Sequence, residues 1–357
     1  MTPLRLPILF LSFFLPVAVF VLLATVFYGQ AEIKRELTGL RSRDNLNVGF
    51  GAGALSHRLN SATEDLNFLA THSALRQAMI ARTPQALAHL SEAFAGFARS
   101  KRIYDQLRWI DETGMEIVRV DLVGGQAALV PTEHLQNKGA RYYFTDSIKL
   151  NPGEVFLSQL DLNVEEGKVE VPYKPTLRLA TPVFDERGEK RGIVILNYRG
   201  QAVLDAFAKA TAAIADHVMV VNSEGYWLKS ANPDDEWGFM FTRADLRLEA
   251  RSPAAWGRIH ATDQGQEFLA DGVWTWQTVY PLFTNQASST GASEAFMPSH
   301  GDVALNRYVW KVVAHLSSDT VFAIQRAVWL RLLVTVVFVL GLIGSVSWVL
   351  ARVWCEP

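Results

Sequence analysis

The segment Lys138–Ser147, with the sequence KGARYYFTDS, places a cation beside aromatic side chains. Arg141 precedes the rings of Tyr142, Tyr143 and Phe144. A guanidinium group is a planar fork that can bind both oxygens of a carboxylate, while aromatic rings form apolar walls and attract cations to their faces. Three roles are therefore open for Arg141: contact with an anionic ligand, an internal ion pair, or exposure to solvent.

Other residues with reactive side chains form no recognisable catalytic or metal-binding pattern. The eight histidines are scattered and lack a spacing such as H-E-x-x-H, and the sequence has no G-x-S-x-G elbow and no P-loop. Gly49–Gly53 (GFGAG) follows no predicted strand and matches only part of the dinucleotide fingerprint, so we interpret it as a weak or closely packed point of a helix. We therefore predict that the protein is not an enzyme and has no catalytic residues, no metal and no cofactor.

Two apolar segments lie near the ends of the chain. Residues 7–28 and 332–351 contain no charged residue, and each is long enough for a membrane span, which needs about 20 apolar residues. A cleaved signal peptide is the alternative for the first segment, but its apolar core is long and no small-x-small cleavage site follows it. Two spans would place both termini on one side of the membrane and the loop between them on the other.

The charges exclude one class of partner. The net charge is −2, and neither half of the chain has the basic stripe that a phosphate backbone requires, so nucleic acid is not a partner. Four basic residues follow the first span: Lys34, Arg35, Arg41 and Arg43. By the positive-inside rule they disfavour export of the loop, but this rule is weak for long loops. The only cysteine, Cys355, lies beyond the second span, so disulfides do not stabilise the loop.

The spacing of apolar residues predicts helices after the first span. One stripe recurs at intervals of four and three and continues the span outward: Leu55, Leu59, Ala62, Leu66 and Leu69. This stripe either pairs two chains or packs onto the protein's own sheet. Thr83 and Pro84 predict the start of a second helix, because a capping residue is followed by proline at the first helical position.

A repeated turn pattern indicates strands in the rest of the loop. Asp or Asn is followed three residues later by Gly at Asp111–Gly114, Asp185–Gly188 and Asn222–Gly225, as in hairpins. The flanking runs have the β-branched and aromatic content of strands: Gln106–Ile110, Ile117–Asp121, Thr176–Phe184, Gly192–Tyr198, Val218–Val221 and Tyr308–His315. The low-complexity segment Thr284–Asp302 is predicted to be a surface loop.

This order of segments resembles the double Cache (tandem PAS-like) extracellular sensor domains attached to bacterial histidine kinases and diguanylate cyclases. The resemblance in the first lobe rests on five segments: Tyr104–Gly114, Arg141–Phe144, Gly153–Leu162, Lys174–Asp185 and Gly192–Tyr198. Asp234–Met240 and Thr275–Leu282 resemble the second lobe. The implied fold is α+β, with a long N-terminal helix, two PAS-like antiparallel-sheet lobes and two flanking transmembrane helices.

The resemblance also implies the organisation of the chain. The expected parts are a transmembrane helix (7–28), a periplasmic helical stalk (31–103), a membrane-distal Cache lobe (104–199), a connector helix (200–215), a membrane-proximal Cache lobe (216–316), an exit helix (317–331) and a second transmembrane helix (332–351). A small-molecule pocket is expected in the distal lobe. In members that bind amino acids, an arginine before an aromatic pair holds the ligand carboxylate, and an acidic residue on the last strand binds the amine.

Part of this ligand motif is present. Arg141 with Tyr143 and Phe144 matches the carboxylate half, whereas Asn197 occupies the position of the expected acidic residue, which disfavours a plain amino acid. Arg178 lies on one strand face with Thr176 and Ala180. We expect Arg178 to be either a second ligand contact or the salt-bridge partner of Asp161 or Glu170, with Asp161 at the rim of the pocket.

We therefore expect a two-pass sensor of the bacterial inner membrane with a large periplasmic loop. It would bind a small, carboxylate-bearing ligand and signal through its membrane helices, as a homodimer. Because the chain ends shortly after the second span, either a separate signalling partner carries the output or the chain is a curtailed form of a longer kinase or cyclase. A two-span envelope protein that tethers or organises other components is the alternative, but its loop would be mostly helical.

Overall fold

The computed structural model describes residues 5–165, 168–281 and 308–355, so the segment 284–302 lies outside the described residues. The chain divides into two compact units. The first unit comprises residues 1–44, 267–273 and 315–357. The second unit comprises residues 45–266 and 274–314.

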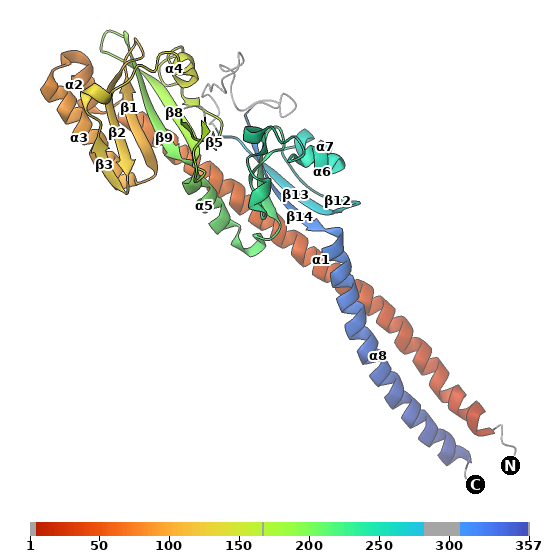
Figure 1. Ribbon diagram of the computed structural model, residues 1–357. Coiled ribbons are helices and arrows are strands. Elements are labelled where there is room, and N and C mark those ends of the chain that lie inside the picture. The colour runs from red at the N-terminus through yellow and green to blue at the C-terminus, as the bar shows by residue number, and fades with distance from the viewer. Residues whose placement is uncertain (1–4, 166–167, 282–307, 356–357) are drawn as a thin grey trace. The chain divides into compact units, whose positions relative to one another are not determined.

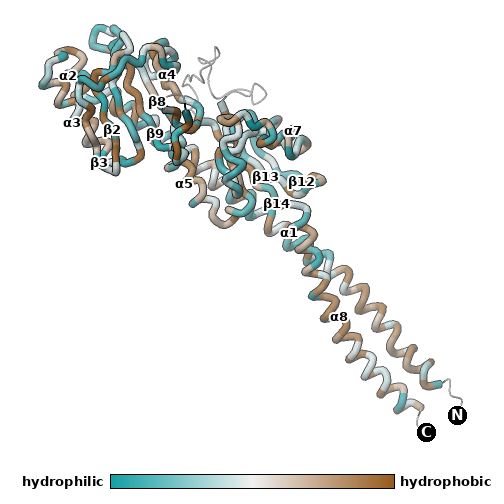
Figure 2. Tube along the Cα trace, in the orientation of Figure 1, coloured by the Kyte–Doolittle hydropathy of each residue, from teal (hydrophilic) through white to brown (hydrophobic). Residues whose placement is uncertain are grey.

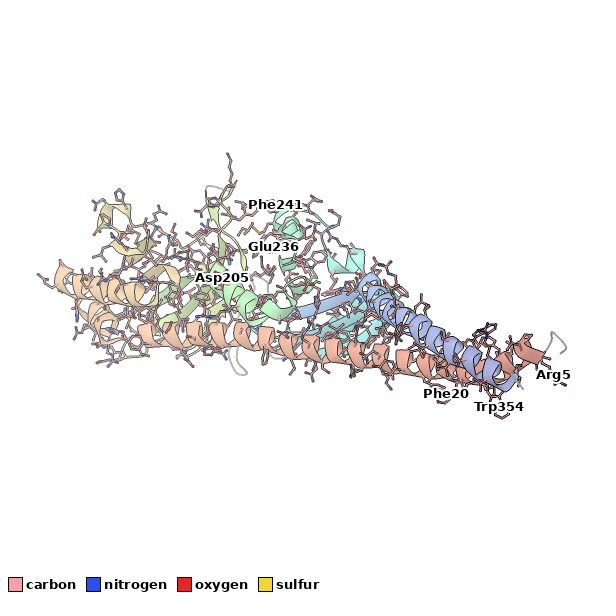
Figure 3. The ribbon with its side chains drawn as sticks, turned by 90° about the horizontal axis from the view of Figure 1, so that it is seen from below. Arg5, Phe20, Asp205, Glu236, Phe241 and Trp354 are labelled. Atoms are coloured by element: carbon pink, nitrogen blue, oxygen red, sulfur yellow. The ribbon has the colours of Figure 1, made fainter. Side chains whose placement is uncertain are left out.

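Two long helices, α1 (Arg5–Ala70) and α8 (Ser318–Cys355), begin and end the described chain. Each contains a segment long and apolar enough to cross a membrane, and little of either segment is buried within the protein. Figure 2 shows hydrophobic residues along both of these segments. Phe20 on α1 and Trp354 on α8 are 71% and 73% exposed (Figure 3). The two predicted apolar helices are therefore present, with large apolar side chains facing outward.

The first unit is held together by contacts between α1 and α8. Gly29 lies directly against Trp329, so that a Cβ atom at this position would be 2.6 Å from the indole ring. Glu36 accepts a hydrogen bond of 2.9 Å from the Arg331 guanidinium. Close packing and this ion pair fix the register of the two helices along one another.

The first sheet, in the second unit, is antiparallel and has the strand order β3-β2-β1-β9-β8-β4, with β5 also pairing β8. Its strands are β1 (Tyr104–Ile110), β2 (Glu116–Val123), β3 (Gln126–Leu129), β4 (Phe156–Leu157), β5 (Asp161–Leu162), β8 (Pro175–Phe184) and β9 (Lys190–Arg199). A separate ribbon pairs β6 (Val164–Glu165) with β7 (Lys168–Val169). The predicted hairpin turns are confirmed, with positive φ at Gly114 and Gly188.

Helices cover one face of this sheet. They are the outer part of α1 together with α2 (Ser73–Ala81), α3 (Pro84–Lys101) and α5 (Gly200–Ala210). The predicted start of α3 is confirmed, because the Thr83 hydroxyl accepts from the Ala86 amide at 3.3 Å and Pro84 is the first helical residue. Helix α2, which the apolar spacing did not indicate, starts where the His72 ring accepts from the Ala74 amide.

The apolar stripe of α1 packs against the chain's own sheet. Its five members are at most 1% exposed within the main apolar core: Leu55, Leu59, Ala62, Leu66 and Leu69. The alternative in which this stripe pairs two chains is therefore wrong. An apolar stripe has the same period whether it pairs two helices or packs onto a sheet, so the period could not distinguish the two. The sheet that covers this face of α1 does.

The glycine-rich segment of α1 is a point of close packing, as predicted. A Cβ atom at Gly51 would lie 2.7 Å from the Thr211 methyl group and 2.8 Å from the Phe207 ring. Gly53, two residues later, has open space around it. Gly51 thus allows α5 to approach α1, whereas Gly53 has no such role.

The second sheet has the strand order β11-β10-β14-β13-β12. Its strands are β10 (Val218–Asn222), β11 (Trp227–Lys229), β12 (Gln264–Leu269), β13 (Gly272–Val279) and β14 (Trp310–Ser317). Two short helices, α6 (Leu248–Arg251) and α7 (Pro253–Ala261), precede β12. The 3-10 turns are η1 (Thr132–His134), η2 (Ala212–Ile214), η3 (Pro233–Asp235) and η4 (Gly238–Phe241). Strand β14 ends at Ser317 and α8 starts at the next residue.

The KGARYYFTDS segment forms a short helix, α4 (Tyr142–Ser147). Figure 1 shows α4 on the side of the first sheet opposite to α2 and α3. Beneath α4 lies a second apolar cluster that we call the α4 cluster: Ile110, Tyr143, Phe144, Leu150, Phe156, Ala180, Ile193 and Ile195. The first sheet is therefore covered on both faces.

Candidate ligand-binding site

A row of polar residues crosses the first sheet on the face that α4 covers. Asp121 pairs with Gln106, Gln106 with Asn197, and Asn197 with Arg178, on four neighbouring strands. Residues directly opposite each other in antiparallel strands share a face. Asn197 and Arg178 are buried, so this row is a polar feature inside a covered sheet face and requires hydrogen-bond partners.

Arg108, on β1, is the most enclosed cation of this face and is 3% exposed. Its Nη1 donates to Glu116 Oε1 at 3.3 Å and to the Tyr143 hydroxyl at 3.2 Å, and its Nη2 donates to Asn197 Oδ1 at 2.9 Å. Its Nε is also buried but finds no acceptor among the residues that the structure describes. Arg108 therefore has one buried N–H donor that could still form a hydrogen bond.

The charge of Arg108 is balanced by Glu116, which is 1% exposed. The second oxygen of Glu116 accepts from the Gln136 amide at 3.1 Å. Asn197 is bonded at both ends of its amide, since its Nδ2 donates to Gln106 Oε1 at 3.0 Å. Because Asn197 is neutral, the compensating carboxylate comes from β2 instead of β9.

Arg178, on β8, forms a second cationic centre and is 7% exposed. Its Nη1 donates to Asp161 at 3.1 Å and to the Tyr142 hydroxyl at 3.3 Å, and its Nη2 donates to Asn163 at 3.2 Å. The predicted salt bridge to Asp161 is confirmed. The Glu170 carboxylate instead accepts from the side-chain amide of Asn163 at 2.9 Å.

Burial and charge act in opposite directions on the titration of this pair. Burial raises the pKa of Asp161, and the Arg178 guanidinium opposes this effect. Burial alone would lower the pKa of Arg178, but the neighbouring Tyr142 and Asp161 raise it. Burial also raises the pKa of Tyr142, so its hydroxyl stays protonated at neutral pH. Arg178 thus remains a cation with its bonding directions fixed by three partners.

Arg141 is exposed at the N-terminal end of α4. Its guanidinium carbon lies 5.9 Å from the centre of the Tyr143 ring, and that of Arg108 lies 5.3 Å from the same ring. No carboxylate of the described residues forms an ion pair with Arg141. The KGARYYFTDS segment therefore brings an exposed cation and a buried cation to one aromatic ring.

Helix α4 is attached to the sheet through the same polar groups. Tyr142 and Tyr143 are adjacent, yet their hydroxyls accept from Arg178 on β8 and Arg108 on β1 respectively. Lys190 of β9 donates to the backbone carbonyl of Leu150, beyond the end of α4, at 2.8 Å. Any molecule that engages the two arginines would change the contacts that hold α4.

The predicted site residues fall into two groups on one sheet face. Arg141, Tyr143 and Asn197 lie around Arg108, while Asp161 and Arg178 lie around Tyr142. Phe144 packs with Tyr143 in the α4 cluster.

Sequence reasoning missed two residues, Arg108 and Glu116. Arg108 could have been noticed as a charged residue between two large apolar residues, Leu107 and Trp109, within a predicted strand. The structure contains no group of three or more His, Cys, Asp or Glu side chains arranged to hold a metal ion, within the described ranges.

Comparison with known families identifies the type of domain. A family model described as the sensor domain of bacterial histidine kinases matches residues 53–287. The chain belongs to this sensor-domain family. Sensor domains of this kind are typically non-catalytic. A comparison with curated protein sequences gave no match.

Solved structures of sensor domains share the fold of this one. One is the extracellular domain of vpHK1S-Z8, which is assigned as a histidine kinase. It is 15% identical in sequence with a TM-score of 0.62, and the match covers 82% of this chain and 95% of that domain. A domain of a sensory box/GGDEF protein from Vibrio parahaemolyticus is also 15% identical with a TM-score of 0.62, over 81% of this chain and 98% of its own.

A chemoreceptor also has this fold. The ligand-binding domain of Tlp3 from Campylobacter jejuni, in complex with L-valine, is 7% identical with a TM-score of 0.53, over 81% of this chain and 97% of its own. At these identities the likeness establishes the fold alone. The α+β, Cache-type architecture expected from the sequence is thereby confirmed.

Proposed function

We propose that this sensor domain binds a small carboxylate-bearing molecule between α4 and the polar row of the first sheet. We assign residues 104–199 to a membrane-distal lobe that carries the site and residues 216–316 to a membrane-proximal lobe. Helices α1 and α8 anchor the chain in the bacterial inner membrane by two passes, with the two lobes in the periplasm. Ligand binding is transmitted through these helices.

The observation that carries the proposal is the Nε of Arg108, which is buried and has no acceptor among the described residues. A buried N–H group without an acceptor costs free energy, and the cost is larger when the group belongs to a cation. Arg108 is held in place by three partners, so its Nε cannot turn toward solvent without breaking them. A ligand oxygen that accepts from this Nε would remove the cost, and a carboxylate oxygen is the strongest acceptor for a guanidinium.

The charges of the site define the class of ligand. Arg108 and Arg178 are each balanced by one carboxylate, whereas Arg141 has no carboxylate partner among the described residues. The site therefore favours a single negative charge. Asn197 carries no charge, so a ligand amine is not required. The rings of Tyr143 and Phe144 suit an apolar remainder.

Signalling requires that the ligand prefers one conformation of the protein. A carboxylate on the Nε of Arg108 would bind the same guanidinium that holds the Tyr143 hydroxyl through Nη1, so its charge would bias the attachment of α4. We further propose that the sensor works as a homodimer. The buried stripe from Leu55 to Leu69 is not available for that homodimer.

The test is a thermal-shift comparison on the full chain in lipid nanodiscs. Three probes are the amino acids L-valine, L-norvaline and isoleucine, which are bound by the Tlp3 domain. The other three are the matching acids without the amine: 3-methylbutanoate, pentanoate and 3-methylpentanoate. A bound ligand raises the unfolding temperature by mass action. We expect the acids without the amine to stabilise the chain at least as well as the amino acids. Stabilisation by none of the six probes would overturn the proposed ligand class.

A further inference from the structure

A hydrogen bond joins the ligand site to a residue that precedes β14. The Tyr308 hydroxyl donates to the backbone carbonyl of Ser158 at 2.6 Å, although 150 positions separate the two residues. Tyr308 is 5% exposed and Ser158 is 1% exposed, so water does not compete for this bond. The Tyr308 ring meets Trp310 edge-on at 6.2 Å. The phenol is therefore fixed by packing at one end and by Ser158 at the other.

Ser158 is also the backbone partner of Arg178. The Ser158 amide donates to the Arg178 carbonyl at 2.9 Å, and the Arg178 amide donates to the Ser158 hydroxyl at 2.9 Å. Ser158 lies in the connection between β4 and β5, three residues before Asp161. The position of this connection decides whether the Asp161 carboxylate reaches the Arg178 guanidinium.

We propose that Tyr308 is a positioning residue of the ligand site in the first sheet. By holding the Ser158 carbonyl, its hydroxyl keeps the β4–β5 connection against β8 and thereby keeps Asp161 on Arg178. This inference rests on the proposed function, since it concerns the affinity of the same site. It adds to the ligand site a residue from outside the distal lobe, because Tyr308 lies two residues before β14, the strand that is followed directly by α8.

A purely structural role makes a different prediction. Loss of the Tyr308 hydroxyl would leave the Ser158 carbonyl buried without this donor and would lower stability in either case. Only a positioning role also loosens the β4–β5 connection selectively and weakens ligand binding. Hydrogen exchange of residues 156–162 and ligand affinity are therefore the readouts that separate the two roles.

The experiment compares Tyr308→Phe with Tyr280→Phe in the full chain in nanodiscs. Tyr280 is the matched control, because its hydroxyl is bonded to Asp263 at 2.5 Å within the second-sheet region. We expect Tyr308→Phe to speed amide exchange in residues 156–162 and to weaken 3-methylbutanoate binding about tenfold, the order expected for one buried hydrogen bond. Tyr280→Phe should change neither.

Two features of the design keep the outcome decisive. Ser158→Ala removes the hydroxyl that accepts from Arg178, so it should produce the same two effects if Tyr308→Phe does not fold. If the wild-type chain binds none of the six probes, the proposed function fails, while the exchange measurement still decides the positioning role. Unchanged exchange in residues 156–162 in both Tyr308→Phe and Ser158→Ala would overturn the inference.

Discussion

Arg108 on β1 and Asn197 on β9 are joined by a hydrogen bond of 2.9 Å across two neighbouring strands. Because Asn197 is neutral, it orients the guanidinium of Arg108 without neutralising it. The neutralising charge comes from Glu116, which is 1% exposed. Strand β9 therefore contributes an amide to Arg108, and the carboxylate that neutralises Arg108 lies on β2, on the other side of β1.

The buried pair of Arg108 and Glu116 should be costly to break from either side. We predict that Arg108→Met and Glu116→Leu each lower the free energy of unfolding by about 3–5 kcal/mol, since each removes the closer partner of a buried charge. Glu116 would keep only the longer contact to Arg119 at 3.9 Å, and Arg108 would keep no carboxylate among the described residues. The double substitution should be less destabilising than the sum of the two, because it leaves no charge behind. Chemical denaturation of the three variants measures this, and strictly additive losses would contradict the pairing.

Arg141 should affect binding but not stability. We predict that Arg141→Ala weakens 3-methylbutanoate binding by about 10-fold to 150-fold, equivalent to loss of one charged hydrogen bond. Arg141→Lys should also bind poorly, because a point charge cannot form the bidentate contact. Isothermal titration calorimetry checks both variants against Arg187→Ala, an exposed arginine in the β8–β9 turn. Full affinity in Arg141→Ala would leave Arg141 as a solvent-exposed residue.

Lys311 on β14 should make stability depend on pH. Burial lowers its pKa to about 8 from an ordinary value of 10.5, and the nearby Asp263 opposes this. Between these two values the folded chain has released a proton that the unfolded chain retains, so stability should rise as the pH increases from 8. We predict that Lys311→Met flattens the rise in unfolding temperature between pH 8 and 9.5, while Lys209→Met, at an exposed site, preserves it. An unchanged slope in Lys311→Met would contradict this assignment.

Two glycines of α1, Gly51 and Gly53, should respond oppositely to alanine. At Gly53, where a Cβ meets open space, alanine should stabilise the helix by about 1 kcal/mol. At Gly51, a Cβ would overlap Phe207 and Thr211, and overpacking of about 1–3 kcal/mol should outweigh the gain in helix propensity. Thermal unfolding of both variants gives the comparison. Equal stabilisation by Gly51→Ala and Gly53→Ala would rule out close packing of α5 on α1.

Much of the fold follows from local patterns in the sequence. The three-four spacing of apolar residues predicts the outer part of α1, and Thr83 with Pro84 predicts the start of α3, because both are set by the geometry of a single helix. The Asp-x-x-Gly turns predict their hairpins because a hairpin turn is also set by residues that are close in sequence. What the stripe of α1 packs against depends on a sheet that is distant in sequence, and its period carries no such information.

The candidate site was only half predictable, for a similar reason. Arg141, Tyr143 and Phe144 are adjacent in the chain, so the motif is visible. The contact between Arg108 and Tyr143 depends on α4, a helix of six residues that is too short to have an apolar period and that closes over β1 from 35 positions away. The burial of Arg108 and Glu116 becomes evident only when both faces of the sheet are covered.

The central claim, that the polar row of the first sheet binds a carboxylate, is tested most directly by two ligands of nearly the same shape. Calorimetric titration of the full chain in nanodiscs with 3-methylbutanoate and with its neutral amide, 3-methylbutanamide, varies only the charge and one donor group. The guanidinium groups of Arg108 and Arg141 predict that the acid binds at least about tenfold more tightly. Equal affinity, or tighter binding of the amide, would contradict a carboxylate site.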